Sequence, residues 1–306
     1  MARAGEHPCI EADCFQSGRE IEERKLSSSS TPIVLLESMT LPGRHFARNL
    51  VHRRTLLLQM VRRDFEQRFI GSTAGWMWGL ILPLVQLASW VFVFQVCMHQ
   101  NVPPGEPTQS YPLFLFCGYL PWLLFQDTVT RSANSMVDNA NLITKTVFPA
   151  EIVPVSIFLS SLASHLMVVV LVITGRGIIT GHFSMWMMML PIYMLLVGLF
   201  AIGVGWIVAS LQVYLRDTAQ VLAVVMVFWF WVTPIFISEQ QIPQRFRFLL
   251  HLNPLASVVQ AYRDRLLSYR IPSLHELAII TAYAITAFVA GGLFFRHLKR
   301  GFADVL

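Results

Sequence analysis

Residues 185–237 read MWMMMLPIYMLLVGLFAIGVGWIVASLQVYLRDTAQVLAVVMVFWFWVTPIFI, two long apolar runs joined by a short turn. The only charged residues in this stretch are Arg216 and Asp217, and both lie in the turn. An apolar run of about 20 residues is long enough to cross a hydrocarbon layer about 30 Å thick as a helix. The stretch therefore predicts two consecutive transmembrane helices whose connection lies at one membrane surface.

Further apolar runs bring the number of predicted spans to six. Hydrophobic residues make up 55% of the 306 residues and charged residues only 13%. A soluble protein usually carries about twice that share of charge. We therefore expect an all-α, polytopic membrane protein with six transmembrane helices, at about residues 74–98, 111–131, 152–174, 185–211, 219–237 and 276–295.

Acidic residues are nearly absent from the predicted spans, and only Asp127 lies well inside one. A proton- or sodium-driven transporter normally binds its ion on acidic groups within the membrane. A P-loop needs a lysine directly after a glycine, and none of Lys25, Lys145 and Lys299 has one there. The sequence also lacks HExxH, a CxxC pair and GxSxG. We expect a membrane pathway with no catalytic residue and no metal site, powered by another protein.

The distribution of Lys and Arg predicts the orientation, because these residues are enriched in cytoplasmic connections. One side of the predicted bundle carries 17 of the 23 basic residues, and that side includes both termini. Both termini are therefore expected in the cytoplasm. Segment 238–274 departs from the rule, since it places five arginines on the outer side.

The N-terminal region has two parts that differ from the spans. Residues 1–43 hold seven acids and a serine run, which predicts a flexible cytoplasmic arm. Residues 44–72 are too charged to cross and have the pattern of an amphipathic helix in the membrane interface. A solvent-exposed helix packed on another domain is the alternative. Residues 73–306 are then the six-helix transmembrane domain. The apolar stripe of the amphipathic helix comprises Phe46, Leu50, Leu57, Val61, Phe65 and Phe69.

Segment 238–274 contains two short helical patterns. The first covers Ile242–Leu252, and the second begins at Asn253 and Pro254, a helix N-cap followed by proline at the first helical position. Neither is long enough to cross a bilayer, so we expect an outer re-entrant pair before the last span. Its outer-gate residues are Tyr262, Arg263 and Arg265, which face lipid phosphate or an acidic polymer. Headgroup contact, or pairing with Asp264, is the alternative.

Small residues within the spans predict close helix packing. Span three has a weakly polar face around His165, which we expect to be packed and hydrogen-bonded to a neighbouring helix rather than to transfer protons. A disulfide between Cys97 and Cys117 is conceivable near the outer face, but the four cysteines suggest no disulfide framework. The packing positions are Ser156, Ser160, Ser161 and Ser164 in span three, and Gly198, Gly203 and Gly205 in span four.

Five groups of residues share their order and spacing with one known family. They are Arg62–Phe69 leading into Gly75–Trp78 and Pro83; Asn141–Lys145 with Phe148–Glu151 and Pro154; Tyr214–Asp217; Thr233–Ile235; and Asn253-Pro254 with Tyr262–Asp264. Over about residues 45–300 the chain resembles the permease subunit of bacterial polysaccharide ABC exporters, the type-2 class that moves O-antigen, capsule or teichoic acid chains.

The resemblance implies a homodimer in the bacterial inner membrane, surrounded by lipids, with a continuous channel for a lipid-linked polysaccharide. Two copies of a separate ATPase subunit would hold the ATP and Mg²⁺, so this chain needs no cofactor and no nucleic acid. Segment 139–151 corresponds to the coupling helix that enters the ATPase, although a plain connecting loop is the alternative. The expected coupling residues are Asn141, Leu142, Ile143, Lys145, Phe148, Glu151, Arg216 and Asp217.

Aromatic residues in the spans are candidates for the substrate channel. An aromatic ring can stack on the apolar C–H face of a sugar without fixing a long chain in one register. Interfacial aromatic belts, lipid-facing rings and packing are the alternatives, but a belt does not explain Trp229 at mid-membrane. The predicted channel residues are Trp76, Trp78, Trp90, Phe228, Trp229, Phe230 and Trp231.

Three other functions remain open from the sequence. An ion-coupled secondary transporter is disfavoured by the nearly acid-free spans. A membrane-embedded glycosyl- or acyltransferase needs clustered acids or a His/Asp pair, for which Asp127 and His165 are a poor candidate. A type-2 ABC exporter of a small lipid or drug would share the same helix plan.

Overall fold

The computed structural model describes residues 54–103, 106–145, 148–181, 184–238, 241–268 and 273–305. The chain divides into two compact units, Met1–Ala47 and Arg48–Leu306, and all described residues belong to the second unit. Regular structure in these residues is entirely helical, which confirms the all-α prediction for this part of the chain. The predicted arm 1–43 and the beginning of the amphipathic helix lie outside the described residues.

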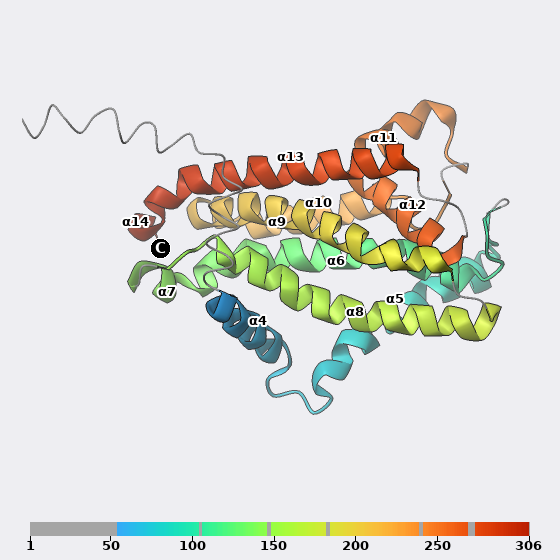
Figure 1. Cartoon of the computed structure of the whole chain (residues 1–306), viewed down its shortest axis with the longest axis horizontal. Coiled ribbons are helices and arrows are strands. Elements are labelled where there is room, and N and C mark those ends of the chain that lie inside the picture. Colours follow the sequence, from blue (N-terminus) through green and yellow to red (C-terminus); the bar gives the residue numbers. More distant parts are fainter. Residues whose placement is uncertain are drawn as a thin grey trace, which may run out of the picture. The chain divides into compact units, whose positions relative to one another are not determined.

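The helices follow one another along the chain with short connections (Figure 1). Their bounds are α4 (Arg54–Phe69), η1 (Gly75–Met77), α5 (Trp78–Val91), the π-helical turn η2 (Phe92–Cys97), α6 (Tyr111–Asp138), α7 (Ala140–Lys145), α8 (Ile152–Thr180), η3 (Met185–Met189), α9 (Leu190–Tyr214), α10 (Thr218–Val232), η5 (Gln244–Phe246), α11 (Arg247–Leu252), α12 (Pro254–Leu267), α13 (Leu274–Leu298), η6 (Lys299–Gly301) and α14 (Phe302–Val305).

Helix α9 lies between α6 and α13 and contacts both along most of its length. Glycines allow this close approach, as predicted for span four. A Cβ atom at Gly203 would lie 2.3 Å from the Ala287 carbonyl oxygen, and one at Gly291 would lie 2.1 Å from the Gly203 carbonyl oxygen. A Cβ at Gly198 would likewise meet the Phe158 ring of α8 at 2.1 Å. These glycines are therefore packing positions, because no side chain fits at them.

Within the described residues, four helical stretches are long and apolar enough to cross a membrane: Gly75–Cys97, Ile152–Ile178, Met185–Tyr214 and Leu274–Gly301. Helix α6 has 28 residues but is more polar than these four. Helix α10 has only 15 residues and ends at Val232, earlier than the predicted span 219–237. Thr233 is extended there, because a proline disfavours helical conformation at the preceding residue. The four stretches identify a multi-pass membrane protein.

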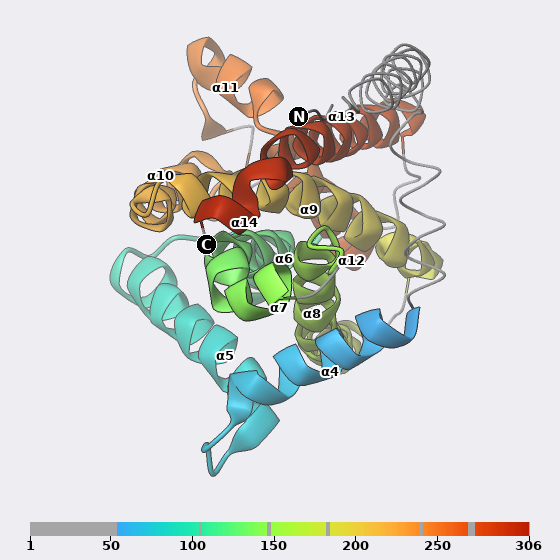
Figure 2. The same cartoon turned by 90° about the vertical axis from the view of Figure 1, so that its left-hand side faces the viewer.

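Helices α4 and α5 lie on the flank of the bundle formed by α6 and α8 (Figure 2). They meet at the connection around Gly71, whose φ of +78° suits glycine, and diverge from there. Helix α4 packs on α8 through Leu57 and Met60, whereas Arg62 points outward and pairs with Glu66. The cysteines Cys97 and Cys117 are both free.

Candidate functional site

Four of the seven predicted channel aromatics belong to one aromatic cluster between α5, α6 and α10. The Trp90 ring lies 5.3 Å from the Phe230 ring and 4.7 Å from the Tyr119 ring. Trp229 packs against Phe125 of α6 at 5.1 Å. The aromatic residues of α6 in this cluster were not among the predicted channel residues, because residues 111–131 were predicted only to form a span. The members are Trp90, Phe94, Tyr119, Trp122, Phe125, Phe200, Trp229, Phe230, Trp231 and Phe236.

The other three predicted channel residues lie outside the cluster. Trp76 lies in η1 and Trp78 is the first residue of α5, and both are about half exposed. Phe228 projects from α10 and is 72% exposed within this single chain. A large apolar side chain that is exposed in one chain needs a lipid, a second protein or a substrate against it. The channel role of these rings stays a prediction.

The predicted coupling segment includes one short helix, α7, directly after α6. Asn141 is exposed, and Leu142, Ile143 and Phe148 are half-buried; Lys145 is the last residue of α7. Arg216 and Asp217 are exposed in the connection between α9 and α10.

Glu151, at the start of α8, makes the most specific contact among the coupling residues. Its Oε1 accepts a hydrogen bond from the Lys299 ammonium group at 2.7 Å, and its backbone carbonyl accepts one from Trp206 Nε1 at 3.1 Å. Helix α14, which follows Lys299, also contacts α7. The end of the chain is therefore joined to the coupling segment, a link that the sequence alone did not reveal.

The predicted outer-gate residues are buried within the chain rather than exposed. Arg263 and Arg265 are each 1% exposed. The Arg263 guanidinium lies 3.9 Å from the centre of the Phe114 ring and donates a hydrogen bond to the Ile235 carbonyl. Arg176 of α8, which the sequence did not single out, donates in the same way to the Leu266 carbonyl. These arginines satisfy carbonyl groups near helix breaks, where buried backbone would otherwise lack a partner.

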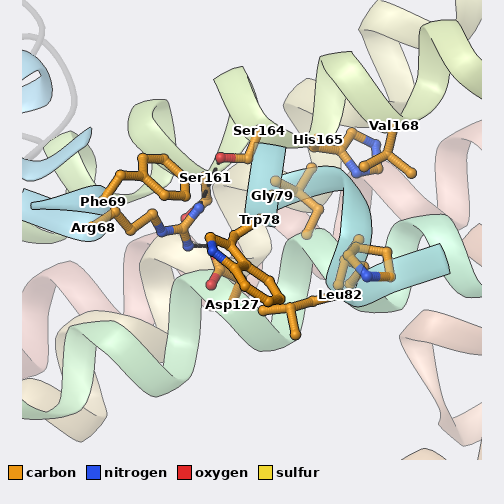
Figure 3. A pocket seen from close by; sticks show the side chains of 13 residues that line it. Arg68, Phe69, Trp78, Gly79, Leu82, Asp127, Ser161, Ser164, His165 and Val168 are labelled. Carbon is orange, nitrogen blue, oxygen red and sulfur yellow. Dashed lines mark hydrogen bonds and ion pairs between the residues drawn. The ribbon is translucent and has the colours of Figure 1, made fainter. Parts of the chain in front are cut away.

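Asp127, the one carboxylate well inside a predicted span, belongs to a row of charges that joins α4 to α6; Figure 3 shows its contact with Arg68. It pairs with Arg68 of α4 and lies 3.8 Å from Arg131 of α6. Arg131 in turn pairs with Asp64 of α4 at 2.5 Å. We call these four residues the charge ladder. Because each acid faces an arginine, the ladder is neutral overall and holds α4 on α6.

Residues of the charge ladder line two cavities. One, of about 500 Å³, is lined mainly by polar residues of α4, α6 and α8, including Asp64, Arg131 and Asp138. Burial raises the pKa of the Asp138 carboxyl above its ordinary value. The other, of about 430 Å³, is lined by α4, α5, α6 and α8 and contains Arg68, Trp78 and Asp127.

His165 lines this second cavity (Figure 3). It is buried, as predicted, and its ring packs edge-on against Tyr262 at 6.2 Å. The predicted hydrogen bond to a neighbouring helix is wrong, because neither ring nitrogen has a partner among the described residues. Among the residues that the structure describes, no group of three or more His, Cys, Asp or Glu side chains could hold a metal ion.

Comparisons with known proteins agree on one family. A family model described as ABC-2 type transporter matches residues 55–267. The chain is 28% identical over 260 residues to the O-antigen export system permease protein RfbA of Myxococcus xanthus, covering 84% of this chain and 97% of that protein. A protein of the same name from Klebsiella pneumoniae is 28% identical over 263 residues, with the same two shares covered. The polysialic acid transport protein KpsM of Escherichia coli is 23% identical over 240 residues, covering 76% of this chain and 89% of KpsM.

Proposed function

The chain belongs to the ABC-2 type transporter family, and from this premise we propose that it exports a lipid-linked polysaccharide across the bacterial inner membrane. It is the non-catalytic membrane subunit of the transporter. ATP and Mg²⁺ bind to a separate ATPase subunit, two copies of which act on two copies of this chain. The polymer passes from the cytoplasmic side through a channel between the two copies.

One observation carries the substrate assignment: the similarity to O-antigen and polysialic acid exporters extends over 97% and 89% of those proteins. The charge ladder supports an external energy source. An acid that binds and releases a coupling ion must be free to change its charge during transport. Asp127 is instead held by Arg68 and faces Arg131. An ion-coupled mechanism therefore lacks a suitable acid inside the described spans.

The proposed topology has six spans, with α6 and α10 added to the four apolar stretches and both termini in the cytoplasm. Helices α11 and α12 form the outer re-entrant pair, which includes the outer-gate residues. The homodimer is supported by exposure on α5, since only 6% of the most apolar part of Gly75–Cys97 is buried within one chain. A second copy facing α5 and α10 would cover these side chains and enclose the aromatic cluster.

The experiment is export by purified components. The chain and its ATPase are reconstituted together in vesicles, and a radiolabelled lipid-linked polysaccharide is supplied on the ATPase side. We expect the polymer to appear on the side of the membrane opposite the ATPase only when ATP and Mg²⁺ are present. Transport by the chain alone under a proton or sodium gradient would contradict the proposal. So would ATP-dependent transport of a short lipid with no transport of the polymer.

A further inference from the structure

The cavity lined by Arg68, Trp78, Asp127 and His165 shares Trp78 with the predicted channel residues but contains no member of the aromatic cluster or of the coupling segment. Its volume of about 430 Å³ lies in the range of about 300–1,000 Å³ that is usual for small-molecule pockets. Four helices contribute to its walls: the amphipathic helix α4, and α5, α6 and α8. A ligand in this cavity would therefore contact both α4 and α5, the two helices that meet at the connection around Gly71.

The charge at the cavity argues against an anionic ligand. Arg68 is the only arginine that lines it, and that guanidinium pairs with Asp127 and donates to Ser164 Oγ at 2.8 Å. The Asp127 carboxylate lines the same cavity and would repel a phosphate group. The ion pair nevertheless offers remaining donors and acceptors to an uncharged polar ligand.

One wall of the cavity is a polar face of α8. Ser161, Ser164 and His165 lie at helical spacing on the same side of this helix. His165 is only 2% exposed, and neither ring nitrogen has a hydrogen-bond partner among the described residues. A neutral imidazole has one donor and one acceptor, and burying them unpaired is unfavourable. A ligand hydroxyl group in the cavity would offer a hydrogen-bond partner to this imidazole.

The opposite walls are apolar and include aromatic rings. Phe69 ends α4, while Trp78, Leu82 and Pro83 belong to α5. A hydrocarbon chain would fit these walls but would leave His165 without a partner. A sugar ring has an apolar C–H face and a rim of hydroxyl groups, so it matches both walls.

We propose that this cavity binds one uncharged sugar unit of the transported polymer, with the ring against Trp78 and hydroxyl groups on His165 and Ser164. The proposal rests on the proposed function, because the polymer supplies the sugar. It adds a carbohydrate site beside the channel, within a single chain, that holds the polymer next to the amphipathic helix.

The test measures sugar binding to the complete complex with its ATPase in lipid nanodiscs. The probe is a set of short oligosaccharides released by mild acid from the lipid-linked polymer that accumulates in cells without the permease. Saturation-transfer NMR should show saturable contact with sugar C–H protons. His165→Leu should weaken binding by about tenfold or more, because it removes a polar contact; Leu82→Trp should weaken it at least as much, because the larger side chain fills the cavity.

Matched controls separate the site from general damage. Val85→Trp adds the same bulk to α5 at a similarly exposed position that does not line the cavity, so binding should be kept. His165→Asn retains a donor and an acceptor and should restore most of the affinity. His165→Leu should not lower the melting temperature, because it removes a buried polar group without a partner. A purely structural histidine would give the opposite result.

Three outcomes would overturn the inference. The oligosaccharides fail to bind, or Leu82→Trp binds them as well as the wild type. Alternatively, native mass spectrometry finds a phospholipid that the wild type retains and Leu82→Trp loses, with no sugar binding, which assigns the cavity to lipid. If polymer accumulates but does not bind, only the sugar site fails. If no lipid-linked polymer accumulates without the permease, the proposed function fails and the sugar site fails with it.

Discussion

At Asp127 a single residue separates two interpretations of the same spans. An acid within a membrane segment indicates an ion-binding site unless a basic partner neutralises it. Here the partner comes from a different element, since Arg68 lies on the amphipathic helix, 59 residues away in sequence. Sequence spacing could not reveal the pair. The structure gives Asp127 the role of a counter-ion that positions α4.

The charge ladder leads to a prediction on stability. Asp127→Asn should destabilise the chain by about 1–3 kcal/mol, because Arg68 loses its charged partner while remaining partly buried. Arg68→Gln should have a similar effect. The double variant should recover part of the loss, since neither charge is then left unpaired. Thermal unfolding of the purified chain in detergent measures these values. Additive losses in the double variant would show that the two residues do not interact.

Residue-scale predictions from the sequence succeeded where a short local pattern decides the outcome. The serines of span three are buried, and Asn253 caps α12 as its position before Pro254 predicted. The hydrogen bond of His165 was not predictable, because a partner depends on which helix faces the ring. Arg263 and Arg265 were predicted at the outer side of the membrane, whereas the structure buries both. Aromatic rings and backbone carbonyls compensate for that burial, and a sequence does not show either.

Among the elements, α9 and α13 depend on glycine for their contact. A Cβ at Gly291 would lie 2.1 Å from a backbone oxygen, which cannot move without shifting α9. We expect Gly291→Ala to lower the melting temperature and the yield of folded protein, at a cost of about 1–3 kcal/mol for overpacking. Gly175→Ala on α8 is the matched control, because a Cβ there meets nothing within 4 Å. Equal stability of the two variants would show that the helices do not pack as described.

The break between α10 and α12 depends on Asn253. Its Oδ1 accepts hydrogen bonds from Leu255 N at 3.1 Å and from Trp229 Nε1 at 2.9 Å, and its Nδ2 donates to Thr233 Oγ1 at 3.1 Å. One side chain thus joins the last turn of α10 to the first turn of α12.

Asn253→Ala should therefore destabilise the chain by about 1–2 kcal/mol or more, the usual cost of a lost N-cap. Asn253→Asp should lose less, because it keeps the acceptor for Leu255 N and Trp229 Nε1. Thermal unfolding, followed by tryptophan fluorescence, measures both variants. If alanine and aspartate are equivalent, the acceptor interactions contribute little.

The length of α13 was predictable to within a few residues at each end, because its apolar pattern is continuous. The length of α10 was less predictable, because a proline late in an apolar run ends the helix while the hydropathy continues. The placement of α4 beside α8 required tertiary contacts and could not be read from its stripe alone.

At the scale of the whole molecule, one ion pair joins the end of α13 to the residue that precedes α8. Lys299 directly follows α13, and Glu151, 148 residues earlier, is the last residue of the coupling segment and the N-cap of α8. Both side chains are about one-third exposed, so their pair contributes little to stability, on the order of 1 kcal/mol or less. Its expected value is positional: it ties the end of α13 to the segment proposed to contact the ATPase.

Reversing this pair tests that connection in the assembled transporter. Glu151→Lys and Lys299→Glu each place like charges together, so each should reduce the polymer exported per ATP hydrolysed while leaving the melting temperature nearly unchanged. The combined reversal restores opposite charges and should recover most of the coupling. Export and ATP hydrolysis measured in the same vesicles give the ratio. Arg300→Glu changes the charge beside Lys299 and serves as the control. If the double variant is as uncoupled as the single ones, Glu151 acts on the ATPase directly rather than through Lys299.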